Sequence, residues 1–188
     1  MAKQEPAMPR SRHDLLTLSL HWLTALLVPL AYLAIQVTEM LPRGALKTQV
    51  YTAHQTLGVL VLAVTLVRLA WRPFAPKPGP AEMPGAMRQA STAVHVLLFL
   101  GLLAVPLLGM LTQWLRGRGV EMFGLFALAP PFAADRPMAR SMKEAHELLA
   151  NALMLLALLH AMAALFHHYV MRDGLIRRML PGRDPGAA

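Results

Sequence analysis

The sequence predicts an all-α integral membrane protein, a four-helix up-down bundle that forms a single domain over residues 1–188. Three observations predict this fold class. The chain is 56% hydrophobic with a mean hydropathy of +0.45, which is too apolar for an ordinary soluble domain of 188 residues. Four stretches are long enough to cross a bilayer, which takes about 20 mainly apolar residues. The charged residues are concentrated between these stretches, as is typical of membrane proteins.

The predicted membrane spans are about 15–37, 52–71, 93–114 and 145–170. Backbone groups in lipid must hydrogen bond within their own segment, so each span is expected to be a helix. Pro29 and Pro106 lie inside the first and third spans, where proline is expected to kink a helix. Residues 73–85 are rich in Pro and Gly and are expected to form a linker. The loop 116–143 carries an apolar patch at 122–134, which is too short to cross and is expected to lie along the membrane surface.

Basic residues predict the orientation of the bundle, because positively charged loops prefer the cytoplasmic side. Four spans place both termini on the same side of the membrane. The terminal side and the loop after the second span together carry eleven basic residues: Lys3, Arg10, Arg12, Arg68, Arg72, Lys77, Arg88, Arg172, Arg177, Arg178 and Arg183. The opposite side carries seven: Arg43, Lys47, Arg116, Arg118, Arg136, Arg140 and Lys143. Both termini are therefore predicted to be cytoplasmic.

Composition excludes several kinds of site. The chain has no cysteine, which excludes disulfides, Cys-ligated zinc, iron–sulfur clusters and covalently attached haem. The net charge is +8, but the basic residues flank the apolar spans and form no separate basic domain. We therefore expect the lipid bilayer as a partner and no nucleic acid.

Four histidines lie in the spans at matching depths. His21 lies early in the first span and His160 late in the fourth, so an up-down bundle brings them level near one membrane face. His54 opens the second span and His146 the fourth, which brings these two level near the other face. His146 and His160 lie almost four helical turns apart, on one helix face and about 21 Å from each other along the axis. Because ionisable groups inside a bilayer are usually functional and two facing imidazoles can hold one haem iron, two haem groups are predicted, with these four histidines as cofactor-binding iron ligands.

Other interpretations of the histidines stay open. Buried histidines can hydrogen bond between helices, although this explains two level pairs less easily than one or two single residues. Zinc is a further alternative, but a two-His site without a carboxylate or Cys at the same depth is a poor zinc site. His95 is expected to be a packing residue near the membrane surface, with contact to a quinone or a haem edge as the alternative. His167 and His168 close the fourth span, where headgroup contact or helix capping is expected.

Four segments of the chain resemble the bacterial cytochrome b561 family: RHDLLTLSLHWLTALLVPLAY, AHQTLGVLVLAVTLVRLAWR, VHVLLFLGLLAVPLLGM and KEAHELLANALMLLALLHAMAALFHHY. The resemblance covers about residues 10–183. It implies a small four-helix dihaem protein of the inner membrane, with non-covalent haem b groups and a quinone as electron partner. By motif position the family's haem ligands fall on the same four histidines: His21, His54, His146 and His160.

The chain is similar in length to the superoxide oxidase type of this family, and this similarity implies the activity. The expected function is a dihaem b electron-transfer protein that oxidises periplasmic superoxide to oxygen and passes the electrons to ubiquinone. Ala145 precedes His146 where an aromatic residue is expected in that type. Two alternatives stay open: a cytochrome b subunit that relays electrons between a partner dehydrogenase or hydrogenase and quinone, and a haem-free membrane protein with a structural or transport role.

Basic side chains are the candidates for contact with anions. Lys143 and Arg43 are predicted on the outer side, where they would steer superoxide toward the outer haem. Anchoring of the loops at lipid headgroups is the alternative for both. Arg12, Arg68 and Arg72 are expected on the cytoplasmic side, where they can pair with haem propionates or anchor the helix ends.

Overall fold

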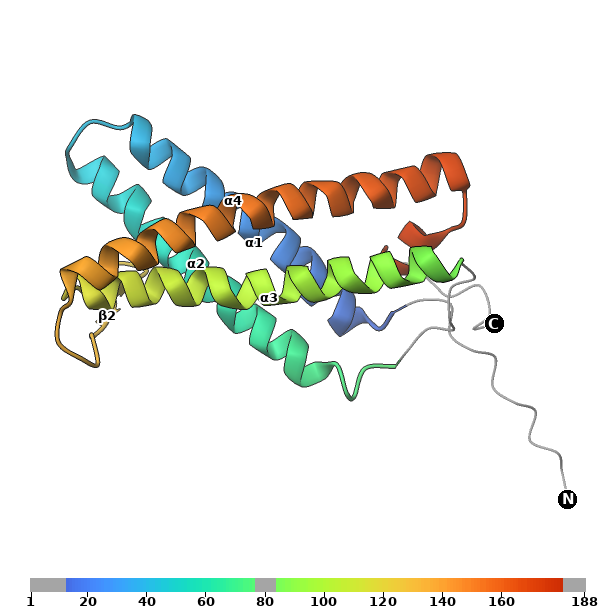
Figure 1. Ribbon diagram of the computed structural model, residues 1–188, viewed down its shortest axis with the longest axis horizontal. Coiled ribbons are helices and arrows are strands. Elements are labelled where there is room, and N and C mark those ends of the chain that lie inside the picture. Colours follow the sequence, from blue (N-terminus) through green and yellow to red (C-terminus); the bar gives the residue numbers. More distant parts are fainter. Residues whose placement is uncertain (1–12, 77–83, 181–188) are drawn as a thin grey trace, which may run out of the picture.

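The structure, a computed structural model, describes residues 13–76 and 84–180 and is built on four long helices (Figure 1). The helices are α1 (Leu15–Met40), α2 (Ala45–Trp71), α3 (Gly85–Leu115) and α4 (Arg136–Phe166). An antiparallel hairpin of β1 (Val120–Met122) and β2 (Phe126–Leu128) connects α3 to α4. Beyond α4 the chain forms a π-helical turn, η1 (His167–Met171), and a 3-10 turn, η2 (Leu175–Met179). All four helices are long and apolar enough to cross a membrane, which confirms the predicted all-α membrane bundle.

The helices α2, α3 and α4 begin seven to nine residues before the predicted spans, whereas α1 begins at residue 15 as predicted, and side chains cap α1 and α4. The Asp14 carboxylate accepts a hydrogen bond from the amide of Thr17 at 3.1 Å and caps α1. Asp135 caps α4 in the same way through the amide of Met138 at 3.0 Å. The predicted loop 116–143 is wrong at its C-terminal end, where residues 136–143 form the first two turns of α4. Of the predicted linker, residues 77–83 lie outside the described part of the chain, and its last residue already belongs to α3.

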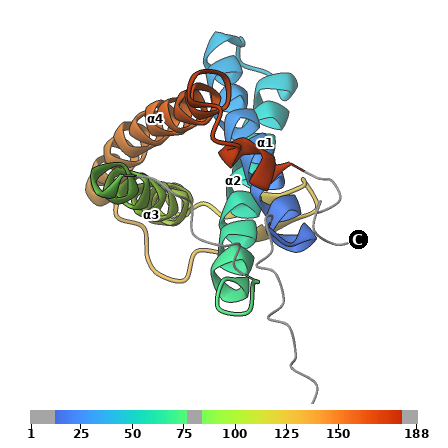
Figure 2. The ribbon, with the colours of Figure 1, turned by 90° about the vertical axis from the view of Figure 1, so that its right-hand side faces the viewer.

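The helices pack as two pairs, α1 with α2 and α3 with α4, and α2 contacts α3 between them. The pairs cross at an angle (Figure 1), and a view from the terminal end shows them side by side (Figure 2). The buried core takes one residue from each helix: Leu27, Val61, Leu102 and Leu153. Many other large apolar side chains on the helices are exposed, above all on α1 and α4, which suits helices that face lipid.

The hairpin is fixed against α2 by side chains of that helix. The Thr56 hydroxyl donates to the carbonyl oxygen of Glu121 at 3.3 Å and accepts from the amide of Phe123 at 2.9 Å. The side-chain oxygen of Gln55 accepts from the amide of Glu121 at 2.7 Å. Val120 is only 2% exposed as a result. The apolar patch at 122–134 thus contains β2 and the last residue of β1, a strand pair that its composition did not predict.

The C-terminal segment returns to the start of α1. Arg172 and Gly174 have φ of 54° and 74°, and this left-handed backbone reverses the chain after η1. The indole nitrogen of Trp22 then donates to the carbonyl oxygen of Met179 at 2.6 Å, and the amide of His13 donates to that of Arg178 at 3.3 Å. Both ends of the described chain therefore lie at the same end of the bundle, called the terminal end below, and the hairpin marks the other end.

Candidate functional site

The hairpin end of the bundle contains a pocket of about 560 Å³ lined by residues of all four helices. This volume lies in the range of cofactor pockets, about 300–1,000 Å³. His54 of α2 and His146 of α4 both line it, and their ring centres are 6.2 Å apart with the planes at 84°. The predicted pair is thus brought together by the fold. We call this pair and its pocket the hairpin-end site.

The hydrogen bonds of both imidazoles fix which ring nitrogen is free. His54 Nδ1 lies 2.8 Å from the carbonyl oxygen of Ala31, and His146 Nδ1 lies 2.8 Å from that of Val105. A carbonyl oxygen can only accept, so Nδ1 carries the proton in each ring. The lone pair of a neutral imidazole is then on Nε2, the arrangement in which histidine binds a metal.

The spacing of the two rings and the glycines beside them fit a haem group. Metal–nitrogen bonds of about 2.0 Å on both sides of one ion place two imidazole centres about 6 Å apart, close to the separation found here. Gly109 lies against His146, where a Cβ would be 3.1 Å from the ring Cε1. Gly58 also lines the pocket, and a Cβ there would meet no atom within 4 Å. The residues therefore fit a flat group held between two histidines.

Polar residues that the sequence reasoning missed surround this site. Tyr51, one turn before His54, stacks on its ring at 6.4 Å between centres, and the amide nitrogen of Gln113 donates to the Tyr51 hydroxyl. The Tyr32 hydroxyl of α1 donates to the side-chain oxygen of Asn151 of α4 at 2.8 Å. Helical spacing was the available signal for Tyr51, which lies three residues from His54. Asn151 lies five residues from His146, so spacing gave no signal for it.

A second group of histidines lies toward the terminal end. His95 of α3 contacts His160 of α4, with ring centres 5.2 Å apart and planes at 81°. His21 of α1 lies near enough to interact electrostatically with both, and its Nδ1 is 3.5 Å from Nη2 of Arg68. In the described residues His160 thus makes its ring contact with His95, not with its predicted partner His21. We call these four residues the terminal-end cluster.

An apolar layer separates the two groups. It is the core set of one residue per helix, and Leu153 lies midway between His146 and His160 in α4. Seven residues on either side correspond to about 10 Å along the helix. The layer therefore leaves the two histidine groups as separate sites toward opposite ends of the bundle. The distance between them is too long for a shared ligand and suits electron transfer.

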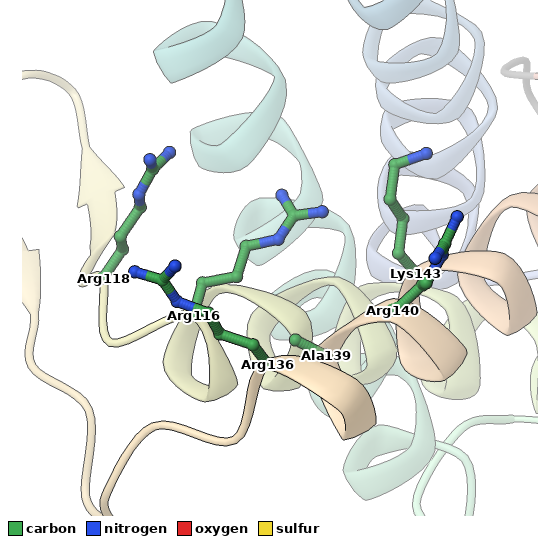
Figure 3. A pocket seen from close by; sticks show the side chains of 6 residues that line it. All are labelled: Arg116, Arg118, Arg136, Ala139, Arg140 and Lys143. Carbon is green, nitrogen blue, oxygen red and sulfur yellow. The ribbon is translucent and has the colours of Figure 1, made fainter.

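A basic pocket of about 520 Å³ adjoins the hairpin end (Figure 3). Its lining comes from the end of α3, the following loop and the start of α4: Arg116, Arg118, Arg136, Ala139, Arg140 and Lys143. Lys143 thus lies on the same surface as other cations, and its ammonium pairs with Glu147, while its role in anion steering stays a prediction. Arg43 is exposed in the turn between α1 and α2 and does not line this pocket.

The remaining candidate residues lie at the terminal end or outside the described residues. His167 pairs with Asp173 across the reversal after α4, and His168 stacks edge-on against Tyr169 at 4.8 Å. Arg72 is exposed, and Arg12 lies outside the described residues. Within residues 13–76 and 84–180, no three His, Cys, Asp or Glu side chains gather to hold a metal ion on their own.

The chain is similar in sequence to known proteins over nearly its whole length. The sequence model of the family described as prokaryotic cytochrome b561 matches residues 12–182. The chain is 31% identical over 166 residues to cytochrome b561 homolog 1 of Escherichia coli (strain K12), which covers 87% of this chain and 94% of that relative. It is 31% identical over 173 residues to the probable superoxide oxidase CybB of Yersinia pestis, with coverage of 90% and 96%. It is 35% identical over 186 residues to cytochrome b562 of Cereibacter sphaeroides, with coverage of 96% and 99%.

Proposed function

The chain belongs to the prokaryotic cytochrome b561 family, and from this premise we propose that it is a superoxide oxidase that passes electrons through two haem b groups to ubiquinone. Membership makes it a multi-pass electron-transfer protein of the bacterial inner membrane that binds haem b. The number of haems, the donor and the acceptor are the proposed parts. A relative with a similar sequence carries the name probable superoxide oxidase, which supports this choice of donor.

In this proposal His54 and His146 hold one haem, and His21 and His160 hold the other. The free Nε2 atoms of the hairpin-end pair and the bare glycine surface of its pocket support the first assignment. The position of His21 and His160 beyond the apolar layer supports the second. A haem iron held by two histidines has no free coordination position, which favours electron transfer over binding of oxygen.

The observation that carries the choice of superoxide is that Arg116 and Lys143 line both the basic pocket and the hairpin-end pocket. A small anion attracted by the basic pocket is thereby delivered beside His146. Cations that line a cleft raise the local concentration of an anion and its rate of arrival, and salt weakens this effect. The proposed role of Lys143 is therefore anion steering, with Arg43 as a more distant contributor.

The proposed reaction is balanced in atoms and charge. Two superoxide anions each lose one electron and leave as oxygen. One ubiquinone takes up both electrons together with two protons and becomes ubiquinol. The chain supplies a basic entry at the hairpin end, two histidine pairs in series and an apolar layer between them that excludes water.

The orientation follows from the same proposal. The hairpin end faces the periplasm, where superoxide arrives, and both termini are cytoplasmic. The surplus of basic residues on the terminal side, eleven against seven, supports this orientation.

The test is haem quantitation followed by an activity assay on the purified protein. Wild type is expected to contain two b haems per chain, and His54→Ala and His21→Ala one each, while His13→Ala outside the pairs keeps two. Wild type in ubiquinone-containing vesicles should then reduce the quinone when superoxide is generated outside. One haem or none in wild type would refute the paired assignment. Two haems without superoxide-driven quinone reduction would refute the substrate and favour a relay for a partner dehydrogenase.

A further inference from the structure

Arg68 is a cation inside a membrane-spanning helix, and its position calls for a function. It lies in α2, seven residues after Val61 of the apolar layer, or about 10 Å toward the terminal end. No carboxylate within the described ranges pairs with its guanidinium. Asp14, the helix cap at this end, is engaged by Thr17 and Trp71. Charged side chains at such depth are costly and mark functional sites.

The contacts of Arg68 hold its charge beside the terminal-end histidines. Nη1 donates to the hydroxyl of Thr24 at 3.3 Å, and Thr24 is only 4% exposed. The guanidinium carbon lies 4.9 Å from the centre of the Phe99 ring, a cation–π contact. Nη2 then lies 3.5 Å from Nδ1 of His21, and the charge also interacts with His160. Arg68 is therefore close to both histidines proposed to hold the terminal-end haem.

The hairpin-end site has a different electrostatic environment. The Nδ1 atoms of its two histidines face neutral carbonyl oxygens, as described above. Arg116 and Lys143 line its pocket, but Glu39 and Glu147 line it as well, and Lys143 is paired with Glu147. Most cations of the basic pocket at this end are exposed at the surface, and Lys143 is paired with a carboxylate. Arg68 lies within a membrane-spanning helix, and no carboxylate in the described residues pairs with it.

From this asymmetry we propose that Arg68 raises the reduction potential of the haem at the terminal-end cluster and so makes electron transfer from the hairpin end energetically downhill. The inference rests on the two-haem function proposed above. Ferric haem carries one more positive charge than ferrous haem, so a fixed cation disfavours the oxidised state. The effect is strong where the surroundings are apolar. The transfer moves one electron and no atoms: the hairpin-end site is oxidised and the terminal-end site is reduced.

A redox titration of the purified holoprotein, followed by visible absorption, tests this role. In Arg68→Gln one of the two haem transitions is expected to move to more negative potential, and the other to stay in place. The haem that moves should be the one that His21→Ala removes. Arg68→Lys keeps the charge and should stay closer to wild type than Arg68→Gln. Arg177→Gln is the matched control, because Arg177 is an exposed arginine at the same end of the bundle.

Thr24→Val keeps the test decisive if Arg68→Gln fails to retain haem. It removes the hydroxyl that holds the guanidinium, so it should shift the same transition in the same direction by a smaller amount. Unchanged transitions in both variants, or a shift of the haem that His54→Ala removes, would overturn the inference. Haem content separates this failure from failure of the proposed function: two haems in wild type with no shift on substitution refute only the role of Arg68.

Discussion

The hydroxyl of Tyr32 on α1 donates a 2.8 Å hydrogen bond to the side-chain oxygen of Asn151 on α4, and both residues line the hairpin-end pocket. These helices belong to different pairs, so the bond joins the two pairs across the proposed haem site. Tyr32→Phe keeps the ring and removes the bond, which is worth about 1 kcal/mol. We expect haem to leave the hairpin-end site about fivefold faster, measured by transfer to a haem-free acceptor protein. The terminal-end haem of the same molecule is the internal control, and equal acceleration at both sites would contradict the prediction.

Gly109 gives His146 the space that its ring occupies. A Cβ at this position would be 3.1 Å from the ring Cε1, so Gly109→Ala forces the imidazole to shift. We expect lower haem occupancy at the hairpin-end site and a changed spectrum for the haem that remains. Gly85→Ala is the control, because a Cβ there meets no atom within 4 Å. Full occupancy in Gly109→Ala would show that the ring has another place to sit.

Substitution of Lys143 and of Arg43 distinguishes local steering of superoxide at the pocket from attraction by the overall positive charge of this end of the bundle. Lys143 lines both pockets, while Arg43 lies in the α1–α2 turn outside them. Lys143→Ala is expected to lower kcat/KM for superoxide severalfold at low salt and to weaken its salt dependence, because part of the attraction is lost. Arg43→Ala should have a smaller effect. Equal losses in the two variants would indicate a long-range field and no specific entry.

Thr56 holds the hairpin through two backbone hydrogen bonds. Thr56→Val keeps the shape of the side chain and leaves these groups unpaired, at a cost of about 1–3 kcal/mol. We expect faster hydrogen exchange at the amides of Glu121 and Phe123. Thr65→Val is the matched control, because Thr65 is buried in the same helix but donates only to the carbonyl of Val61. A hairpin that exchanges at the same rate in both variants would mean that Thr56 does not fix it.

The attachment of the C-terminal segment is expected to weaken in mild acid. Burial lowers the pKa of His13 below 6.5; Asp14 opposes this shift and the cation of Arg178 adds to it. The unfolded segment then binds the proton more readily than the folded one. The stability from neutral His13 is therefore complete above pH 6.5 and is lost as the pH falls below that value.

Hydrogen exchange in residues 175–179, corrected for the intrinsic effect of pH, measures this attachment. Protection should fall between pH 7.5 and 5.5 in wild type, and this pH dependence should disappear in His13→Gln. A variant with the same pH dependence as wild type would assign the effect to another group.

Hydropathy was sufficient to predict four membrane helices, because a bilayer demands long apolar segments and helical hydrogen bonding. It could not locate the start of α4 at Arg136, since the first turns of that helix carry three basic residues and depend on the cap from Asp135. It also missed the hairpin, whose strands are three residues long and are held by Gln55 and Thr56 from a distant part of the sequence.

Depth matching predicted which histidines lie level, and the fold brings His54 and His146 together accordingly. Their role as ligands stays a prediction. Depth alone could not place His95 against His160, because that contact depends on how far each helix is rotated about its own axis. Such rotation is hard to predict when lipid-facing and core-facing positions are both apolar.

The pairing of α1 with α2 and of α3 with α4 sets the order in which this protein can be made. Each pair is a helical hairpin whose backbone is satisfied on its own, so both can enter the membrane before any haem arrives. In the proposed ligand assignment haem then joins the pairs, since His54 and His146 come from different ones. Without haem, the two halves are held together by the apolar layer, the Tyr32–Asn151 bond and the contacts of the hairpin with α2. Cells short of haem would therefore contain chains that open more often and are cleared sooner by proteases.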